Sequence, residues 1–200
     1  MDERRMPRDR RTPRDRLPEA LIDFYGLAPL PREGGRFRRT WAGPMRPDGR
    51  PEGSAIVMLL TAEPGDFSAL HRLPTDEIWH YYRGDPLTLL LLSEEAGSPD
   101  ADSPDADTPG AHASAAGTPA TTPARTVLLG PDILAGQHVQ FTVPAGTWMA
   151  AEVAEGGSWT LFGCTMAPGF TFADYEHGDA AELAARFPQE AARIAALSRP

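Results

Sequence analysis

The chain has 200 residues and a formal net charge of −9, enough for one ordinary domain. All 19 basic residues are Arg, and the absence of Lys and Asn excludes a Schiff-base lysine, a P-loop lysine and N-linked glycosylation. The single cysteine, Cys164, excludes an internal disulfide and any multi-cysteine metal site. The first residues do not resemble a signal peptide, and the longest apolar run, Leu87–Leu92, is too short to cross a bilayer. We therefore expect a cytoplasmic protein without a membrane partner.

Residues 1–16 form an Arg-rich segment with a net charge of +3. It contains no aromatic residue for stacking on bases, and Pro7 and Pro13 disfavour a helix. We interpret it as a disordered, solvated tail and expect no nucleic-acid partner. The rest of the chain carries a charge of −12.

A second unusual segment covers residues 93–124. It repeats SPDAD, contains six acidic residues and no Arg, and lacks Leu, Ile, Val, Met and aromatic residues. Such a segment cannot bury enough apolar area to offset the entropy of ordering it. We therefore predict a disordered acidic insertion within a single domain that spans residues 17–200.

The remaining sequence predicts one helix, a series of short strands and two more helices. Pro18 suits the first turn of a helix whose apolar residues run from Leu21 to Tyr25, and Gly26 ends it. Two Ala-rich helices follow the strands and are separated by Pro188. The predicted strands are Phe37–Trp41, Ala55–Thr61, Ser68–Leu70, Ile78–Tyr82, Leu87–Leu92, Arg125–Leu129, Val139–Val143, Thr147–Val153 and Trp159–Met166. This pattern is typical of an antiparallel sandwich or barrel.

Two motifs suggest a family. Gly65, His71, Glu77 and Gly84 follow the spacing G-x5-H-x5-E-x6-G, and a Pro144-Ala-Gly146 turn follows a strand later in the chain. In this order the segments resemble the cupin superfamily, and more specifically its cupin-5 subgroup, a domain of unknown function. Further matching segments are Glu33-Gly34-Gly35, His71-Arg72-Leu73, Asp76–His80, Gly84–Leu87, Val143–Trp148 and Cys164–Phe170. The resemblance implies a mainly β fold, a jelly-roll barrel (double-stranded β-helix) with short N- and C-terminal helices. It also implies a small-molecule pocket and a homodimer.

The motifs depart from the pattern of metal-binding cupins, which offer three His and one Glu. Leu73 stands at the second His position of the first motif, and Met149 stands at the His position of the second. Only His71 and Glu77 remain, and a thioether is a poor ligand for manganese, iron or nickel. We therefore expect no metal and no other cofactor.

The expected pocket still offers acid–base chemistry. Strand alternation places Glu77, Trp79 and Tyr81 on one face and His80 on the other. Some cupin relatives epimerise nucleotide-linked sugars without metal, using His as the base and Tyr as the acid. By that resemblance, His71 is the predicted base, Glu77 its orienting carboxylate and Tyr81 the acid. The alternative interpretation is that His71 and Glu77 only hydrogen-bond each other and join two strands.

The predicted ligand-binding residues are Arg38, Trp79, Gln140 and Met149. Trp79 would form an aromatic wall, and an inward Arg38 would hold a carboxylate or phosphate. Cys164 is expected to be a buried, inert thiol.

The sequence is therefore compatible with three alternative functions. The first is a metal-independent isomerase or epimerase acting on a small polar metabolite. The second is a dioxygenase-like metalloenzyme with a recruited third ligand. The third is a non-catalytic dimeric scaffold or binding protein whose acidic insertion meets partners.

Overall fold

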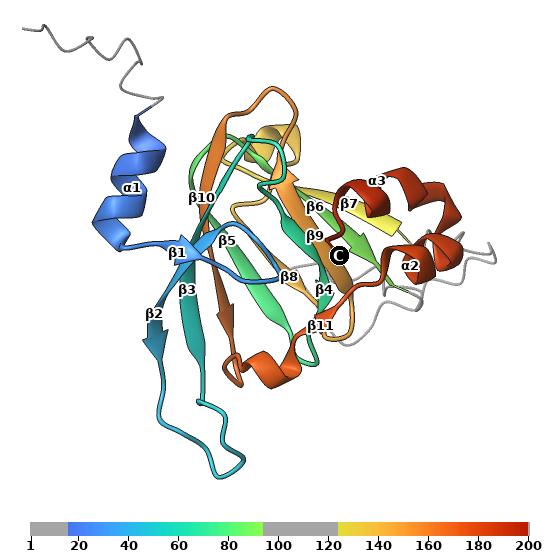
Figure 1. The fold of residues 1–200 in the computed structure, drawn as a ribbon. Helices are drawn as coiled ribbons and strands as arrows, with labels where there is room; N and C mark the ends of the chain where they lie inside the picture. Colours follow the sequence, from blue (N-terminus) through green and yellow to red (C-terminus); the bar gives the residue numbers. More distant parts are fainter. Residues whose placement is uncertain (1–15, 94–123, 200) are drawn as a thin grey trace, which may run out of the picture.

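A computed structural model describes residues 16–93 and 124–199 (Figure 1). The predicted tail over residues 1–16 and insertion over 93–124 therefore lie almost wholly outside the described residues. Helices occupy α1 (Leu17–Tyr25), α2 (Ala180–Arg186) and α3 (Ala191–Ala196). The strands are β1 (Ala28–Pro29), β2 (Arg36–Ala42), β3 (Ser54–Thr61), β4 (Ser68–Arg72), β5 (Glu77–Gly84), β6 (Leu87–Leu92), β7 (Ala124–Leu129), β8 (Gln140–Val143), β9 (Trp148–Val153), β10 (Trp159–Met166) and β11 (Glu176–His177).

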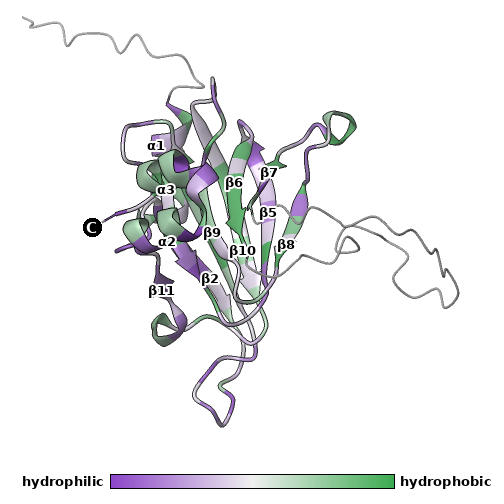
Figure 2. Ribbon diagram, turned by 90° about the vertical axis from the view of Figure 1, so that its right-hand side faces the viewer, coloured by the Kyte–Doolittle hydropathy of each residue, from purple (hydrophilic) through white to green (hydrophobic). Residues whose placement is uncertain are grey.

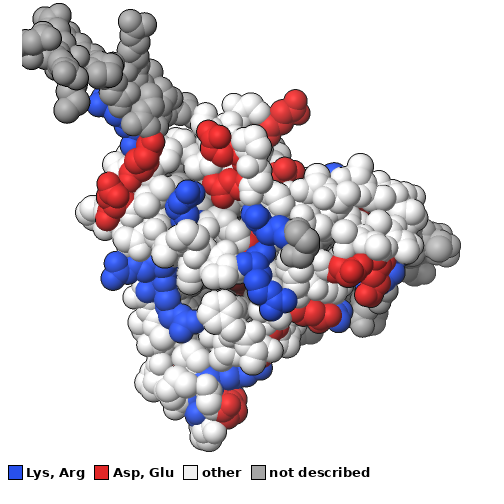
Figure 3. Space-filling view, viewed as in Figure 1, with Lys and Arg blue, Asp and Glu red and all other residues white. Residues whose placement is uncertain are grey.

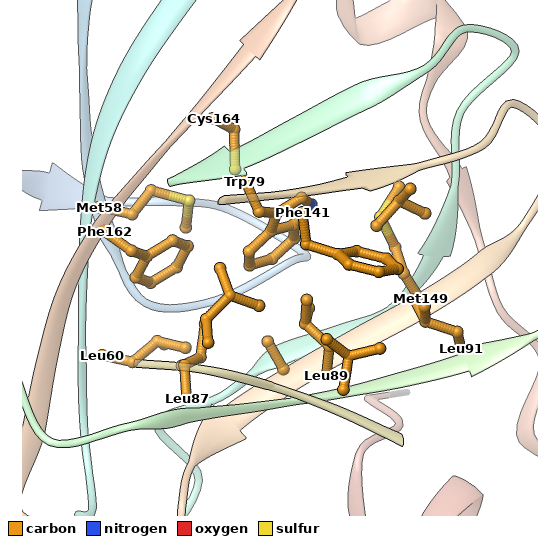
Figure 4. Close-up of a cluster of buried hydrophobic side chains, with 14 of the residues drawn as sticks. Met58, Leu60, Trp79, Leu87, Leu89, Leu91, Phe141, Met149, Phe162 and Cys164 are labelled. Carbon is orange, nitrogen blue, oxygen red and sulfur yellow. The ribbon is translucent and has the colours of Figure 1, made fainter. Parts of the chain in front are cut away.

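Two antiparallel sheets lie face to face. One has the strand order β1-β2-β3-β10-β5-β8, and the other has the order β11-β4-β9-β6-β7. The space between them is filled largely by apolar side chains, among which Trp79 and Phe162 stack with ring centroids 5.1 Å apart (Figure 4). The predicted mainly β fold with short flanking helices is confirmed.

Helices cover the outer face of each sheet. Leu21 and Ile22 of α1 pack against Trp159 and Leu161 on the first sheet. Helices α2 and α3 cover the second sheet, where Leu183 and Ile194 join a second buried cluster. Among the described residues no helix is both long and apolar enough to traverse a lipid bilayer.

Strand β6 shows why its sequence is a continuous apolar run. Leu87, Leu89 and Leu91 point into the space between the sheets, whereas Leu90 and Leu92 pack under the C-terminal helices. Because both faces of the strand are covered, it has no solvated side, and Figure 2 shows β6 mostly in the hydrophobic colour.

Local signals fix the ends of several elements. Gly26 adopts a left-handed conformation with φ of 61° and ends α1, as the sequence predicts. The side chain of Asp179 caps α2 by accepting a hydrogen bond from the Glu182 amide. Pro188 separates α2 from α3 through a single 3-10 turn. The two-residue strands β1 and β11 are not signalled by the sequence, because each is formed by tertiary pairing alone.

Candidate functional site

A small cavity of about 40 Å³ lies between the sheets, beside the apolar core. Its polar lining comes from six elements or loops of the chain: Glu33, Arg39, Ser54, His71, Glu77 and Cys164. Its apolar walls are Leu30, Phe37, Ile56, Leu73, Met166 and Phe170. The cavity therefore combines an imidazole, two carboxyls, a thiol and a guanidinium within an apolar enclosure.

Strand pairing brings His71 and Glu77 to this cavity. His71 lies on β4, where its Cα is paired with that of Met149 on β9 and with that of His177 on β11. Glu77 begins β5 and is paired with Met166 on β10. Both side chains are buried, with 2 % and 6 % of their surface exposed. The structure thus joins the two residues that the first motif predicted to work together.

The imidazole of His71 is held in one orientation. Its Nδ1 donates a hydrogen bond to the Ala69 carbonyl at 2.7 Å. The ring stacks on Tyr175 with centroids 5.3 Å apart and planes 17° apart. Because Nδ1 carries the proton in this arrangement, the lone pair of the neutral ring lies on Nε2.

The carboxyl of Glu77 is in an unusual electrostatic position. Its Oε2 accepts a hydrogen bond from Trp79 Nε1 at 2.9 Å, and the Cys164 thiol bonds the same carboxyl. Burial raises the pKa of Glu77 from 4.5 to about 7, since it penalises the charged form. The charge of His71 and these hydrogen bonds oppose the rise, whereas Glu33 adds to it. Glu77 can therefore gain or lose a proton near neutral pH.

Cys164 does not behave as a nucleophile. Burial, together with the neighbouring Glu77 and Glu33 carboxyls, raises the pKa of its thiol well above the usual value. The protonated thiol instead supports Glu77, in line with the sequence interpretation.

Glu33 lines the cavity but is not among the site residues predicted from the sequence. It sits in the turn between β1 and β2, and its Oε1 accepts a hydrogen bond from the Ser68 hydroxyl at 2.8 Å. The preceding residue, Arg32, adopts a positive φ of 69°, which is rare outside glycine. The sequence gives no signal for this turn geometry, so only the family match marked Glu33.

Arg38 and its neighbour Arg39 lie on opposite faces of β2. Arg38, the predicted ligand-binding residue, points out of the cavity and donates to the Tyr25 carbonyl of α1 at 2.9 Å. Arg39 lines the cavity on the same face as Phe37. Strand alternation is the reason, because residues 37 and 39 face one way and residue 38 the other. Arg38, which would hold a ligand only if it faced inward, therefore faces outward.

Four further predicted site residues do not line the cavity. The hydroxyl of Tyr81 donates to the Gly84 carbonyl at 2.7 Å, farther along β5. Gln140 is exposed, since on β8 it is Phe141 and Val143 that face inward. Met149 faces inward but is part of the apolar core, with 1 % of its surface exposed (Figure 4). Trp79 also lies in this core and reaches the site only through its hydrogen bond to Glu77.

The family model described as "Cupin superfamily (DUF985)" matches residues 19–178. The chain belongs to this cupin family. Among solved structures, the cupin resembles protein SO0799 from Shewanella oneidensis with 31 % identity and a TM-score of 0.71, covering 91 % of this chain and 97 % of the other. It also resembles a hypothetical protein from Leishmania major with 30 % identity and a TM-score of 0.69, covering 91 % and 98 % of the two chains. The comparison with curated proteins gave no match.

The cupin's own residues do not fit the three-His, one-Glu metal set of metal-binding relatives. Leu73 contributes an aliphatic wall to the cavity, and Met149 is buried in the core. The Glu77 carboxyl is engaged by an indole and a thiol, both of which donate to it. Within residues 16–93 and 124–199 no group of three or more His, Cys, Asp and Glu side chains is placed to hold a metal ion.

Proposed function

We propose that this cupin binds a small polar metabolite in the cavity between its sheets and moves a proton on it without a metal, as an isomerase or epimerase does. One observation carries the proposal. A buried carboxyl that titrates near neutrality shares the cavity with an imidazole whose tautomer is fixed. Pairs of titratable groups of this kind are what general acid–base catalysis requires.

The two groups have complementary roles. The Nε2 lone pair of His71 accepts a proton from the ligand, because Nδ1 is already bound to the Ala69 carbonyl. The protonated form of Glu77 returns a proton from a second position in the cavity, and its partners Trp79 and Cys164 keep it in place. One proton leaves the ligand and one returns, so the reaction needs no oxidant or reductant. Glu77 takes the role that the sequence had given to Tyr81, whose hydroxyl bonds to backbone outside the cavity.

The cavity volume also limits the size of the ligand. At about 40 Å³ it is small beside the roughly 300–1,000 Å³ of pockets that enclose drug-sized molecules. The part of the ligand that enters it is therefore only a few atoms long. This supports a short metabolite, or the end of a longer one, with polar groups next to His71 and Glu77.

Proton exchange tests the proposal. The protein is incubated in D2O with short hydroxy acids, oxo acids and sugars, and the loss of each C–H signal is followed by NMR. We expect exchange on at least one of them, slowed by roughly 100-fold or more in His71→Gln and in Glu77→Gln, the usual size of a general acid–base contribution. His80→Gln is the matched control, because His80 bonds Thr165 and does not line the cavity.

Two results would overturn the proposal. One is exchange at the same rate in the wild type and in both cavity variants. The other is a ligand that binds in the cavity without any exchange, which would favour the non-catalytic binding protein.

A further inference from the structure

Arg39 lines the cavity, but the proposed proton transfer does not use its guanidinium. The other charged or titratable lining groups are Glu33, His71, Glu77 and Cys164. Arg39 is exposed, whereas His71 and Glu77 are buried. It therefore stands at the mouth, with the acid–base pair deeper inside.

The position of Arg39 is set by strand β2. Its Cα is paired with that of Ile56, another lining residue, and the register then advances so that Trp41 is paired with Ala55. This irregularity inserts Thr40 as an extra residue directly after Arg39. Such bulges bend a strand and re-aim side chains, and they are frequent next to functional sites.

Neighbouring arginines are committed to contacts with the protein, and Arg39 is not. Arg36 lies 3.7 Å from the Asp66 carboxylate, Arg38 donates to the Tyr25 carbonyl, and Arg199 donates to backbone carbonyls of the loop after β3. In the part of the chain that the structure describes, the Arg39 guanidinium has neither an ion pair nor a hydrogen bond to a protein group. Its five donors remain available to a ligand.

The surface on this side of the molecule is consistent with that role. Figure 3 shows arginine side chains gathered over β2 and again nearer the C-terminal end, with uncharged surface between them. This arrangement contrasts with the net charge of −9 for the whole chain. Asp and Glu side chains also lie on this face, so the positive charge that an anion meets is local to the arginine groups.

We infer that the ligand is a short hydroxy- or oxo-carboxylic acid whose carboxylate binds Arg39 and whose hydroxyl or carbonyl end reaches His71 and Glu77. This inference rests on the proposed function and names its substrate class. A guanidinium offers a planar fork that matches a carboxylate. Phe37, Ile56 and Phe170 form apolar walls that suit a short carbon chain between the two ends. A phosphate dianion fits less well, because a single guanidinium faces it and the Glu33 carboxyl lies in the same cavity.

Binding of lactate and lactamide tests the inference. The two probes have nearly the same shape and differ in charge, and inorganic phosphate serves as a third probe. The indole N–H signal of Trp79 reports on the cavity, since that group is bonded to Glu77. We expect Arg39→Gln to weaken lactate binding at least 10-fold and Arg38→Gln to change it less than 2-fold, with lactamide binding weakly and equally to all three proteins. Arg38 is the matched control because it carries the same charge one residue away and points outwards.

Several results would overturn the inference. They are equal losses in Arg39→Gln and Arg38→Gln, tighter binding of phosphate than of lactate, lactamide binding as tightly as lactate, or no lactate binding by the wild type.

The outcome can be separated from that of the proposed function. Arg39-dependent lactate binding without proton exchange would support the anion site and refute the proton transfer. Proton exchange on a neutral sugar that is unaffected by Arg39→Gln would do the reverse.

Discussion

At the residue scale, the most consequential feature is the Glu77 carboxyl, which is buried away from the water that would normally stabilise its charge. Glu77 is held by Trp79 and Cys164, yet burial still raises its pKa to about 7. A protein gains nothing in stability from ionising such a group, and strongly perturbed residues of this kind are concentrated at functional sites. The free-energy cost of burying an ionisable carboxyl at Glu77 therefore indicates that this residue has a functional role.

This cost predicts how stability depends on pH. The folded-state pKa of about 7 lies above the reference value of 4.5, so the folded state holds the proton more tightly than the unfolded state. Stability from Glu77 is complete below pH 4.5 and is lost as the pH rises to about 7. At about 1.4 kcal/mol per pKa unit, the loss is on the order of 3 kcal/mol.

Glu77→Gln removes this dependence. We expect the variant to be more stable than the wild type at pH 8, by up to about 3 kcal/mol in the free energy of unfolding, and nearly equal to it at pH 4.5. Denaturant unfolding at both pH values measures the difference. Glu63→Gln, the same change at an exposed position, should shift neither value. A Glu77→Gln variant that is less stable at pH 8 would contradict the assignment.

Cys164 gives a second residue-scale prediction. Its thiol is buried, and its pKa is raised by that burial and by the neighbouring carboxyls. We expect a thiol-specific chromogenic reagent to leave Cys164 unmodified in the folded protein at pH 8 and to modify it on unfolding in guanidinium chloride. Rapid modification of the folded protein would show that the thiol is exposed or ionised.

Part of this site was predictable from the sequence, and part was not. Motif spacing identified His71 and Glu77, because they lie on consecutive strands of the two facing sheets and a short loop joins those strands. It failed at Arg39, because the face on which a residue lies in β2 depends on a register that only pairing with β3 defines. Glu33 depends on a turn with a positive φ at Arg32, for which the sequence offers no glycine at that position.

At the element scale, the strands were recognisable because most combine β-branched and aromatic residues with flanking Gly and Pro. Gly84, the last glycine of the first motif, shows how such a signal arises. It ends β5 with φ of 107°, and a Cβ placed there would lie 2.3 Å from the Trp159 carbonyl oxygen. The motif therefore records a close approach between β5 and the start of β10.

Two glycine substitutions separate backbone strain from this close approach. Gly146 also has a positive φ, of 77°, but no atom lies within 4 Å of a Cβ placed there. We expect Gly146→Ala to cost about 1–2 kcal/mol in the free energy of unfolding, from strain alone. Gly84→Ala should cost clearly more, because the Trp159 backbone must also move. Equal losses, measured by urea unfolding of both variants, would contradict the packing around Gly84.

At the scale of the whole molecule, the fold places the catalytic candidates between the two sheets, and in the described residues part of the β2 edge has no strand partner. Strand β1 pairs with β2 only at Arg36 and Phe37. Among the described residues, β2 has no strand partner beyond Phe37 on that side, and Trp41 is 53 % exposed. An open edge of this kind invites pairing with another strand.

The homodimer implied by the family remains a prediction, and we propose this edge for it. We expect light scattering to give twice the mass of one chain. Trp41→Arg should shift the protein towards the monomer, whereas Phe24→Arg, at an exposed position on α1, should not. A monomeric wild type, or a dimer that tolerates Trp41→Arg, would argue against the edge as the interface.

The proposed proton transfer depends most directly on the Glu77 carboxyl, and NMR titration of the 13C signal of this carboxyl in the wild-type protein tests it. Burial beside His71, Trp79 and Cys164 predicts a midpoint near pH 7. Because the charge of His71 lowers this pKa, His71→Gln should move the midpoint higher still. A midpoint near 4.5 that His71→Gln leaves unchanged would show that the two groups do not share one enclosed site, and the proposed proton transfer would fall with it.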